Sequence, residues 1–381
     1  MGSPIRQVVI KLQSRCNLSC TYCYVYESVD QSRRDQPVTM SPSTIERMAH
    51  RIGEHAARHA LSTMQVVLHG GEPLLAGHTV VEAALEAVSA ALPPFTVPRF
   101  SVQTNGILLD EHFLDIFHRY GVRVGVSLDG DATATNRHRV YANGRGSYDR
   151  ITAGLRLLGL DQHRDIYGGI LCTIDLHNDP IEVFTALTAF RPPMIDLLLP
   201  HGNWTNPPPP GPGTIGYAEW LIRVFDAWLD GSPDIRIRLF ESVIARLFGR
   251  PSSTEAIGGE IPGIVTIETD GSYEQSDALK TTVAGGPATG LAITDRTFDD
   301  VLAHLEVTAP VTLSATCRRC DIVSVCGGGL RAHRYRADNG LDNPSVYCAD
   351  LMALIAHIRT RVLEGVAALQ VRADLAAGVA G

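Results

Sequence analysis

Three cysteines lie close together near the start of the sequence, in the stretch SRCNLSCTYCYVYE. Cys16, Cys20 and Cys23 have the spacing C-x3-C-x2-C. A closed structural zinc site usually takes four ligands, in pairs spaced C-x2-4-C. Three thiolates from one loop instead suit a [4Fe–4S] cluster that keeps one iron free for an outside ligand. The spacing favours such a cluster, with a zinc ion that takes a distant fourth ligand, or reduced core cysteines, as alternatives.

Four more cysteines lie near the other end of the sequence. Cys317, Cys320, Cys326 and Cys348 have the spacing C-x2-C-x5-C-x21-C. Four thiolates form a complete site, and this spacing fits zinc about as well as a [4Fe–4S] cluster. The eighth cysteine, Cys172, lies in the apolar run GGILCTID, where we expect it to pack as a small hydrophobic residue.

Strands and helices are expected to alternate regularly over the first two hundred residues, and they can position these cysteines. Six apolar runs read as strands: RQVVIKL, QVVLHG, RFSVQT, VRVGVSL, YGGILCTI and IDLLLP. Helices are expected from Ser41, a plausible N-cap, and at roughly 76–92, 110–119, 147–159 and 180–190. This alternation predicts an α/β fold with a parallel sheet, open or closed into a barrel. Because the strands are almost wholly apolar, we expect both sheet faces to be covered.

The pattern changes after the sixth predicted strand. The stretch PHGNWTNPPPPGPG cannot continue a strand or a helix and predicts an extended loop. Two helices are expected at roughly 216–229 and 236–248, followed by a hairpin that turns at Asp270 and Gly271. A closing helix is expected to bury one apolar face, formed by Leu351, Leu354, Ile355, Ile358 and Val362.

The first cysteine loop and the strand ends resemble the radical S-adenosylmethionine (SAM) superfamily. An aromatic residue precedes the third cysteine, and GGEP, QTNG and SLDG end the second, third and fourth predicted strands. The resemblance implies a partial (β/α)6 barrel that holds SAM against the cluster, where one-electron reduction yields a 5′-deoxyadenosyl radical. The cofactor-binding residues that it implies are Tyr22, Gly70, Gly71, Glu72, Pro73, Thr104, Asn105, Ser127, Asp129 and Arg139.

The late cysteine block resembles a reduced SPASM extension, the C-terminal domain of peptide-modifying radical SAM enzymes. This resemblance favours iron–sulfur over zinc. The sequence departs from the family where Gly-Gly-Gly-Leu330 follows Cys326, where Ser276 replaces a cysteine, and in the window 255–262, which has no cysteine. Three ligands of one auxiliary cluster are therefore absent and all four of the other remain. We expect two [4Fe–4S] clusters, one that binds SAM and one auxiliary.

Three longer sequence stretches point to a more specific family. PHGNWT, DGSYEQSDALK and CGGGLRAHRYR…DNPSVYCADL resemble the FxsB-type radical SAM/SPASM peptide maturases. This resemblance implies that a Cβ hydrogen is abstracted from a ribosomally synthesised precursor peptide and that the carbon is joined to an aromatic ring, which forms a cyclophane. Sulfatase-type oxidation, thioether formation or epimerisation are alternatives, because they would use the same cofactors and the same cofactor-binding residues. A non-catalytic iron–sulfur or zinc protein is an alternative that GGEP beside the three cysteines disfavours.

Several residues are candidates for roles beyond cofactor binding. Asp277 follows Ser276, and in sulfatase-maturing relatives an aspartate after the corresponding cysteine is assigned as a base. Glu274 is the second candidate, and a turn or cap role is the alternative for Asp277. His201, Asn203 and Trp204 follow the sixth predicted strand, where a loop at the active-site end is expected to contact substrate, and a purely structural turn is the alternative.

Composition excludes several classes of protein. The 381 residues are 45% hydrophobic and 19% charged, which is typical of a folded globular chain. A net charge of −8 argues against a nucleic-acid partner. No apolar run reaches the ~18 residues of a membrane span, and no signal peptide is recognisable. We therefore expect a cytoplasmic enzyme.

Three regions and several partners are expected. Residues 1–215 form the radical SAM partial barrel, 216–255 bridging helices, and 256–381 the SPASM-like domain with the closing helix. The expected partners are a precursor peptide and an external one-electron reductant of the flavodoxin or ferredoxin type. Because the first cysteine is residue 16, no peptide-recognition domain precedes it in this sequence. The precursor either binds the core directly or is delivered by a separate protein.

Overall fold

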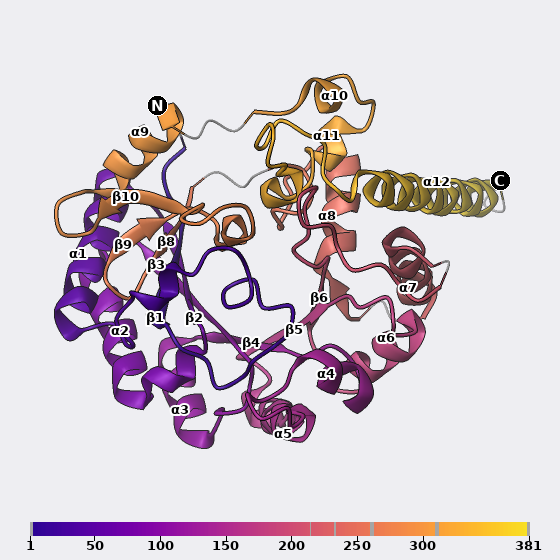
Figure 1. The fold of residues 1–381 in the computed structure, drawn as a ribbon. Coiled ribbons are helices and arrows are strands. Elements are labelled where there is room, and N and C mark those ends of the chain that lie inside the picture. The colour runs from indigo at the N-terminus through magenta and orange to yellow at the C-terminus, as the bar shows by residue number, and fades with distance from the viewer. Residues whose placement is uncertain (1–2, 214, 232–233, 260–262, 309–311, 379–381) are drawn as a thin grey trace.

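One curved sheet organises the computed structural model, which describes residues 3–213, 215–231, 234–259, 263–308 and 312–378. Ten strands follow the order β10-β9-β8-β1-β2-β3-β4-β5-β6-β7 and curve into an open barrel (Figure 1). The strands are β1 (Gln7–Gln13), β2 (Thr63–Gly70), β3 (Val97–Thr104), β4 (Arg123–Ser127), β5 (Tyr167–Thr173), β6 (Met194–Leu198), β7 (Arg236–Ile237), β8 (Ile264–Ile267), β9 (Ser272–Glu274) and β10 (Ala288–Ala292). The six predicted strands are β1 to β6, and the predicted α/β class is confirmed.

Helices connect the parallel strands and cover the outside of the barrel (Figure 1). The first of them starts as expected, because the Ser41 side chain accepts a hydrogen bond from the Thr44 backbone N–H. The helices are α1 (Pro42–Arg58), α2 (His78–Ala91), α3 (Glu111–Tyr120), α4 (Ala132–His138), α5 (Tyr148–Leu158), α6 (Pro180–Thr188), α7 (Tyr217–Gly231), α8 (Arg238–Leu247), α9 (Phe298–Thr308), α10 (Ala315–Arg318), α11 (Val323–Cys326) and α12 (Cys348–Gly378).

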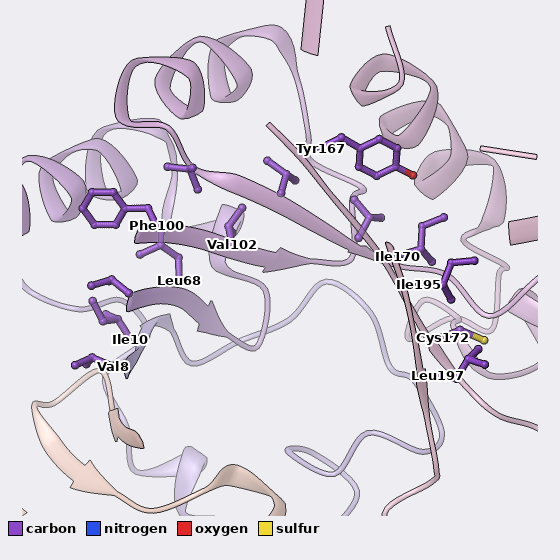
Figure 2. Close-up of a cluster of buried hydrophobic side chains, with 14 of the residues drawn as sticks. Val8, Ile10, Leu68, Phe100, Val102, Tyr167, Ile170, Cys172, Ile195 and Leu197 are labelled. Atoms are coloured by element: carbon purple, nitrogen blue, oxygen red, sulfur yellow. The ribbon is translucent and has the colours of Figure 1, made fainter. Parts of the chain in front are cut away.

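The two faces of the sheet differ in polarity. Side chains that face the helices are apolar and buried, and Figure 2 shows part of this core, which includes Cys172 as expected. Side chains on the other face point into the barrel, because neighbouring residues of a strand alternate between faces. There, residues such as Gln7, Gln65 and Gln103 line a cavity of about 580 Å³. The expectation that both sheet faces are covered therefore does not hold where this cavity lies against the inner face.

The predicted hairpin continues the barrel sheet. Strand β8 pairs in parallel with β1, from Gln7 opposite Ile264 to Ile10 opposite Ile267, and β9 returns antiparallel to β8. The turn lies at the predicted position, where Gly271 has a φ of +90° and donates its N–H to Glu268 O at 2.9 Å. Residues that follow β8 therefore lie next to the carboxyl end of β1. Asp277, in the segment that follows β9, folds back to contact Lys11 of β1.

The closing helix α12 packs against α7 and α8 through the predicted apolar face. Leu351, Leu354, Ile355 and Ile358 are buried, and Val362 is half-buried. Cys348 is the first residue of α12, so that this packing also positions a predicted metal ligand. Within the described ranges, every helix is too short or too polar to cross a membrane.

Candidate active site

The first cysteine loop and the carboxyl ends of strands β2 to β6 enclose one cavity. Its volume is about 220 Å³ and it lies at the carboxyl ends of the parallel strands, where α/β barrels place their active sites. Most of the residues predicted to bind the cluster or SAM line it: Cys16, Cys20, Cys23, Tyr22, Gly70, Gly71, Glu72, Thr104, Asn105, Ser127 and Arg139. Pro73 and Asp129 are not among the lining residues. Pro73 begins a short 3-10 helix (Pro73–Ala76) directly after the GGE turn.

Two glycines allow the end of β2 to approach the cysteine loop. Gly71 N–H donates to Gln13 O at 2.8 Å, and Glu72 N–H donates to Arg15 O at 3.0 Å. A Cβ atom on Gly70 would lie 2.3 Å from Gln13 O, and one on Gly71 would lie 1.8 Å from the Tyr26 hydroxyl. Because real Cβ atoms do not approach other atoms so closely, this turn needs glycine at both positions.

Glu72 is a buried carboxylate held by its neighbours. It accepts hydrogen bonds from the Thr104 hydroxyl at 2.7 Å, the Asn105 N–H at 2.7 Å and the Leu74 N–H at 3.0 Å. Burial raises the pKa of Glu72 to about 7, although these hydrogen bonds oppose the shift. A cationic group in the cavity would favour the charged form of Glu72.

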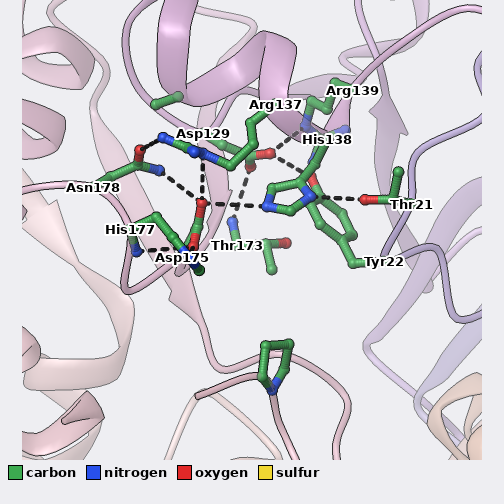
Figure 3. A network of polar contacts seen from close by, with 12 residues as sticks. Thr21, Tyr22, Asp129, Arg137, His138, Arg139, Thr173, Asp175, His177 and Asn178 are labelled. Carbon is green, nitrogen blue, oxygen red and sulfur yellow. Dashed lines mark hydrogen bonds and ion pairs between the residues drawn. The ribbon is translucent and has the colours of Figure 1, made fainter. Parts of the chain in front are cut away.

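Asp129 lies behind the cavity wall and positions two residues that line it (Figure 3). Its carboxylate accepts hydrogen bonds from the Tyr22 hydroxyl and from Arg139 Nε, the latter at 2.9 Å. The Thr173 N–H donates to its other oxygen at 3.0 Å. The guanidinium of Arg139 therefore stays beside the cysteine loop, where it can bind an anionic group.

The three thiols of this loop need a cationic partner to ionise. Burial raises the pKa of Cys16 to about 12 and that of Cys20 to about 11, and it also raises the pKa of Cys23. Thiolate, and not thiol, is the form that ligates metals. An iron–sulfur cluster supplies the positive charge that would offset this cost, so that the residues present fit the predicted group.

A second cavity of about 290 Å³ adjoins the first. The two share a wall, formed by Tyr24, His69, Leu198, Leu199 and His201. Residues after the hairpin strands close the second cavity on another side: Ser276, Asp277 and Ala278. A molecule bound in the second cavity would therefore lie beside the contents of the first.

Asp277 is a buried, ionised carboxylate in this second cavity. One oxygen, Oδ2, lies 2.8 Å from Lys11 Nζ. Burial alone would raise the pKa of Asp277, but Lys11 and then Lys280 outweigh it, so that the pKa is lowered. The other oxygen, Oδ1, is buried and makes no hydrogen bond. Asp277 therefore presents one oxygen that can accept a hydrogen bond or a proton from a bound molecule.

Three imidazoles with an unpaired nitrogen also line this cavity. His69 Nδ1, His201 Nδ1 and His333 Nε2 are buried and make no hydrogen bond. Burial lowers the pKa of His69 and of His201 to about 4, so that both are neutral near pH 7. Unpaired buried polar atoms are destabilising, at about 1–3 kcal/mol each. Their concentration around one cavity indicates a polar ligand such as a peptide backbone.

Glu274, the second candidate base, lies apart from both cavity walls. Its carboxylate accepts a hydrogen bond from Lys280 Nζ at 2.8 Å, and Glu268 lies 3.3 Å from the same Nζ. Burial, followed by the charge of Glu268, raises the pKa of Glu274 to about 8. Glu268 also lies 3.6 Å from Lys11 Nζ, so that three carboxylates and two lysines form one buried network.

The three predicted substrate contacts have different environments. His201 lines both cavities and packs edge-on against Tyr24, with ring centroids 4.6 Å apart. Asn203 is fully buried and donates to Thr281 O at 3.0 Å. Trp204 is half-exposed and donates to Pro344 O at 2.7 Å. Of the three, only His201 lines the cavities, where it can contact a bound molecule. The other two connect the loop to the C-terminal extension, the region from about residue 256 onwards.

The four late cysteines surround a separate cavity of about 240 Å³. Cys317 lies on α10, Cys326 ends α11 and Cys348 begins α12, while Cys320 follows α10. The remaining lining is mostly apolar and includes Ile322, Val323 and Met352. Burial raises the pKa of Cys326 to about 11 and also raises that of Cys348. All eight cysteines of the chain are free thiols.

The sequence alone did not assign four residues to the second cavity or to the buried network of lysines and carboxylates beside it. Lys11 and His69 are paired in register between β1 and β2 and point to the same face. Tyr24 lies in the loop just after the third cysteine, and His333 packs against His201 with ring centroids 5.6 Å apart. A lone lysine inside the apolar run VVIKL was the signal for the first of them, because an unpaired charge rarely occupies a buried strand.

Comparisons with known proteins agree with this geometry. The family described as the radical SAM superfamily matches residues 10–184. A serine-type anaerobic sulfatase-maturating enzyme of Klebsiella aerogenes is 30% identical over 350 residues, which cover 85% of this chain and 79% of that protein. A cysteine-type anaerobic sulfatase-maturating enzyme of Clostridium novyi is 25% identical, over 88% of this chain and 90% of that protein.

Solved structures share the fold over almost the whole chain. The structure of native anSMEcpe with bound AdoMet has a TM-score of 0.77 at 22% identity and covers 94% of this chain and 98% of that one. Streptococcus suis SuiB bound to precursor peptide SuiA has a TM-score of 0.61 at 13% identity and covers 91% and 76%. The sequence matches and the cysteine loop beside the GGEP turn show that the chain belongs to the radical SAM superfamily.

Proposed function

We propose that this enzyme abstracts a Cβ hydrogen from a residue of a precursor peptide and joins that carbon to an aromatic ring carbon of a nearby residue. The observation that carries the proposal is the pair of adjoining cavities. One is lined by the three-cysteine loop and the GGEP turn, and the other by Asp277 and unpaired polar atoms. A peptide in the second cavity would present a side chain to the first.

The residues of the first cavity are those that would hold the cofactors. Cys16, Cys20 and Cys23 would ligate a [4Fe–4S] cluster, and Glu72 and Arg139 would bind the amino and carboxylate groups of SAM. When bound and reduced by an external flavodoxin or ferredoxin, these groups supply a 5′-deoxyadenosyl radical, which removes one hydrogen atom. The protein orients the peptide and excludes water.

Asp277 has the properties of the base that this reaction needs. After the new carbon–carbon bond forms, the ring must lose one proton and one electron to become aromatic again. Lys11 keeps Asp277 ionised. Asp277 lines the second cavity and its Oδ1 makes no hydrogen bond, so that this oxygen could accept the proton. An iron–sulfur cluster held by the late cysteines would be the electron acceptor. The peptide then loses two hydrogens in total.

Oxidation of a serine or cysteine side chain is the second candidate function. The relatives from Klebsiella aerogenes and Clostridium novyi are sulfatase-maturating enzymes, and they support it. Such an oxidation also begins at Cβ and also needs a base. The two candidates therefore share every step up to the carbon radical.

Mass spectrometry of a co-expressed peptide separates the two functions. The enzyme and the precursor peptide encoded beside it are co-expressed without oxygen, with Asp277→Asn as the control. A cross-link removes two hydrogens and suppresses backbone fragments between the joined residues. A serine-derived aldehyde also loses two hydrogens, but it reacts with hydroxylamine and fragments normally. An unmodified peptide in the presence of intact clusters, or a peptide of unchanged mass, would overturn the cross-linking proposal.

A further inference from the structure

Two imidazoles and one carboxylate converge where the C-terminal extension meets the outside of the barrel. His55 and His59 lie four residues apart at the end of α1 and share a face of the helix. Asp299 lies in the first turn of α9 and faces both rings. The three potential ligand atoms all lie within 4.8 Å of one another.

One carboxylate oxygen is shared between the two rings. Asp299 Oδ1 lies 2.7 Å from His59 Nε2 and 3.3 Å from His55 Nδ1. The side chain of His55 is only 2% exposed, and its ring interacts with Asp299 and with the Ile5 backbone, although neither ring nitrogen makes a well-formed hydrogen bond. A buried imidazole without a well-formed hydrogen bond is destabilising, and a metal ion bound at Nδ1 would remove part of that cost.

We propose that His55, His59 and Asp299 bind a zinc ion through Nδ1, Nε2 and Oδ1, with water as the fourth ligand. Zinc takes histidine nitrogens and carboxylate oxygens at about 2.0–2.2 Å in a tetrahedron, which places ligand atoms about 3.4 Å apart. The atoms of His55 and Asp299 already have this separation, and His59 is partly exposed and has room to move.

Arg58 supports the same assignment. Its Nε lies 2.9 Å from Asp299 Oδ2, and this ion pair leaves Oδ1 directed at the two rings. Metal-ligating carboxylates commonly have a second polar partner, which fixes their orientation. Since His59 and Asp299 are partly exposed, a metal ion and a water ligand can reach the site from solvent.

The position of the site indicates what the metal would do. None of the three ligands lines either active-site cavity. The ligands instead join α1, a helix of the barrel, to α9, which follows the hairpin strands that carry Asp277 towards the active site. A bound zinc ion would therefore fix the C-terminal extension against the barrel.

Metal titration of the holoenzyme tests the proposal. Anaerobically purified protein with its iron–sulfur clusters is titrated with zinc, and binding is followed by calorimetry and by the thermal unfolding midpoint. We expect one zinc per chain and a higher midpoint. His59→Ala and Asp299→Asn should weaken binding at least a hundredfold, and Arg58→Met by about 10–100-fold. His50→Ala is the matched control, because His50 is an exposed histidine of the same helix.

Cobalt identifies the ligands independently of stability. Co²⁺ in the proposed site should give the visible absorption of a tetrahedral nitrogen and oxygen site without the ultraviolet bands of thiolate ligation. Loss of this spectrum in His59→Ala, with iron content unchanged, would support the proposal. Zinc binding of the same affinity in His59→Ala, no zinc uptake by the wild type, or a cobalt spectrum with thiolate bands would overturn it.

Discussion

Replacing Lys11 by methionine removes the cation that keeps Asp277 ionised. The lysine side chain is 2% exposed, and its Nζ lies 2.8 Å from Asp277 Oδ2. At an effective dielectric constant of about 20, opposite unit charges at this separation attract by about 6 kcal/mol. Methionine keeps most of the length of the side chain but has no charge. Because burial already acts to raise the pKa of Asp277, the pKa should rise above the ordinary value for aspartate in this variant.

The expected consequence is a change in the pH profile of product formation. A carboxyl group with a raised pKa is protonated below that pKa and cannot accept a proton there. At pH 7 the rate of peptide product formation should fall by about 10²–10⁴-fold and recover as the pH is raised to about 9. Cleavage of SAM to 5′-deoxyadenosine should continue, because Lys11 lies outside the lining of the first cavity. Chromatography of both products from the same reactions measures the two rates.

Lys280→Met is the matched control for this experiment. Lys280 is also 2% exposed, but its hydrogen-bonded partner is Glu274. Removing one member of a buried ion pair costs about 3–5 kcal/mol, so both variants should lose a similar amount of stability. The shift in pH profile should be clearly larger for Lys11→Met. An unchanged profile in Lys11→Met, or the same shift in both variants, would refute the assignment of Asp277 as a base controlled by Lys11.

Three further predictions concern the other parts of the site. The pKa of Glu72 is raised to about 7 in the folded protein, so folding favours the protonated carboxyl group. The SAM-free protein should therefore lose about 3 kcal/mol of unfolding free energy as the pH rises from about 4.5 to 7. Denaturant titrations measure this loss, and Glu72→Gln should abolish it. Gly71→Ala places a Cβ 1.8 Å from the Tyr26 hydroxyl, so calorimetry should show SAM binding weakened by about tenfold or more. Cys348→Ala should halve the iron content and leave SAM cleavage intact, whereas Cys172→Ala, in the hydrophobic core, should leave the iron content unchanged.

Most of the lining of the first cavity could be predicted from sequence because each of its parts is local. The three cysteines belong to one loop, and GGEP, QTNG and SLDG each end a strand. Once the strands are known to be parallel, their carboxyl ends must meet at one edge of the sheet. The lining of the first cavity follows from these two facts without any long-range pairing. Asp129 was placed only by the structure, which puts it behind the wall as the partner of Arg139.

The second cavity could not be predicted in the same way. It depends on strand β8 pairing with β1, two segments that are far apart in the sequence, and no local pattern specifies that pairing. The same strand brings Glu268 and Asp277 to Lys11, which looked like an isolated charge in an apolar strand. A largely apolar run predicts a strand covered on both faces, and this pattern does not reveal the polar inner face of the barrel.

The two cavities are lined by different parts of the chain, and this suggests different roles for those parts. Every residue that lines the first cavity lies at or before His201, near the start of the proline-rich loop at the end of the barrel half. Asp277 and His333, which line only the second cavity, come from the C-terminal extension. Under the proposed function, formation of the radical would depend on barrel residues, whereas the fate of the peptide radical would depend on residues that the extension brings in. Changes in the extension should alter the product, or uncouple SAM cleavage from peptide modification, without stopping SAM cleavage itself.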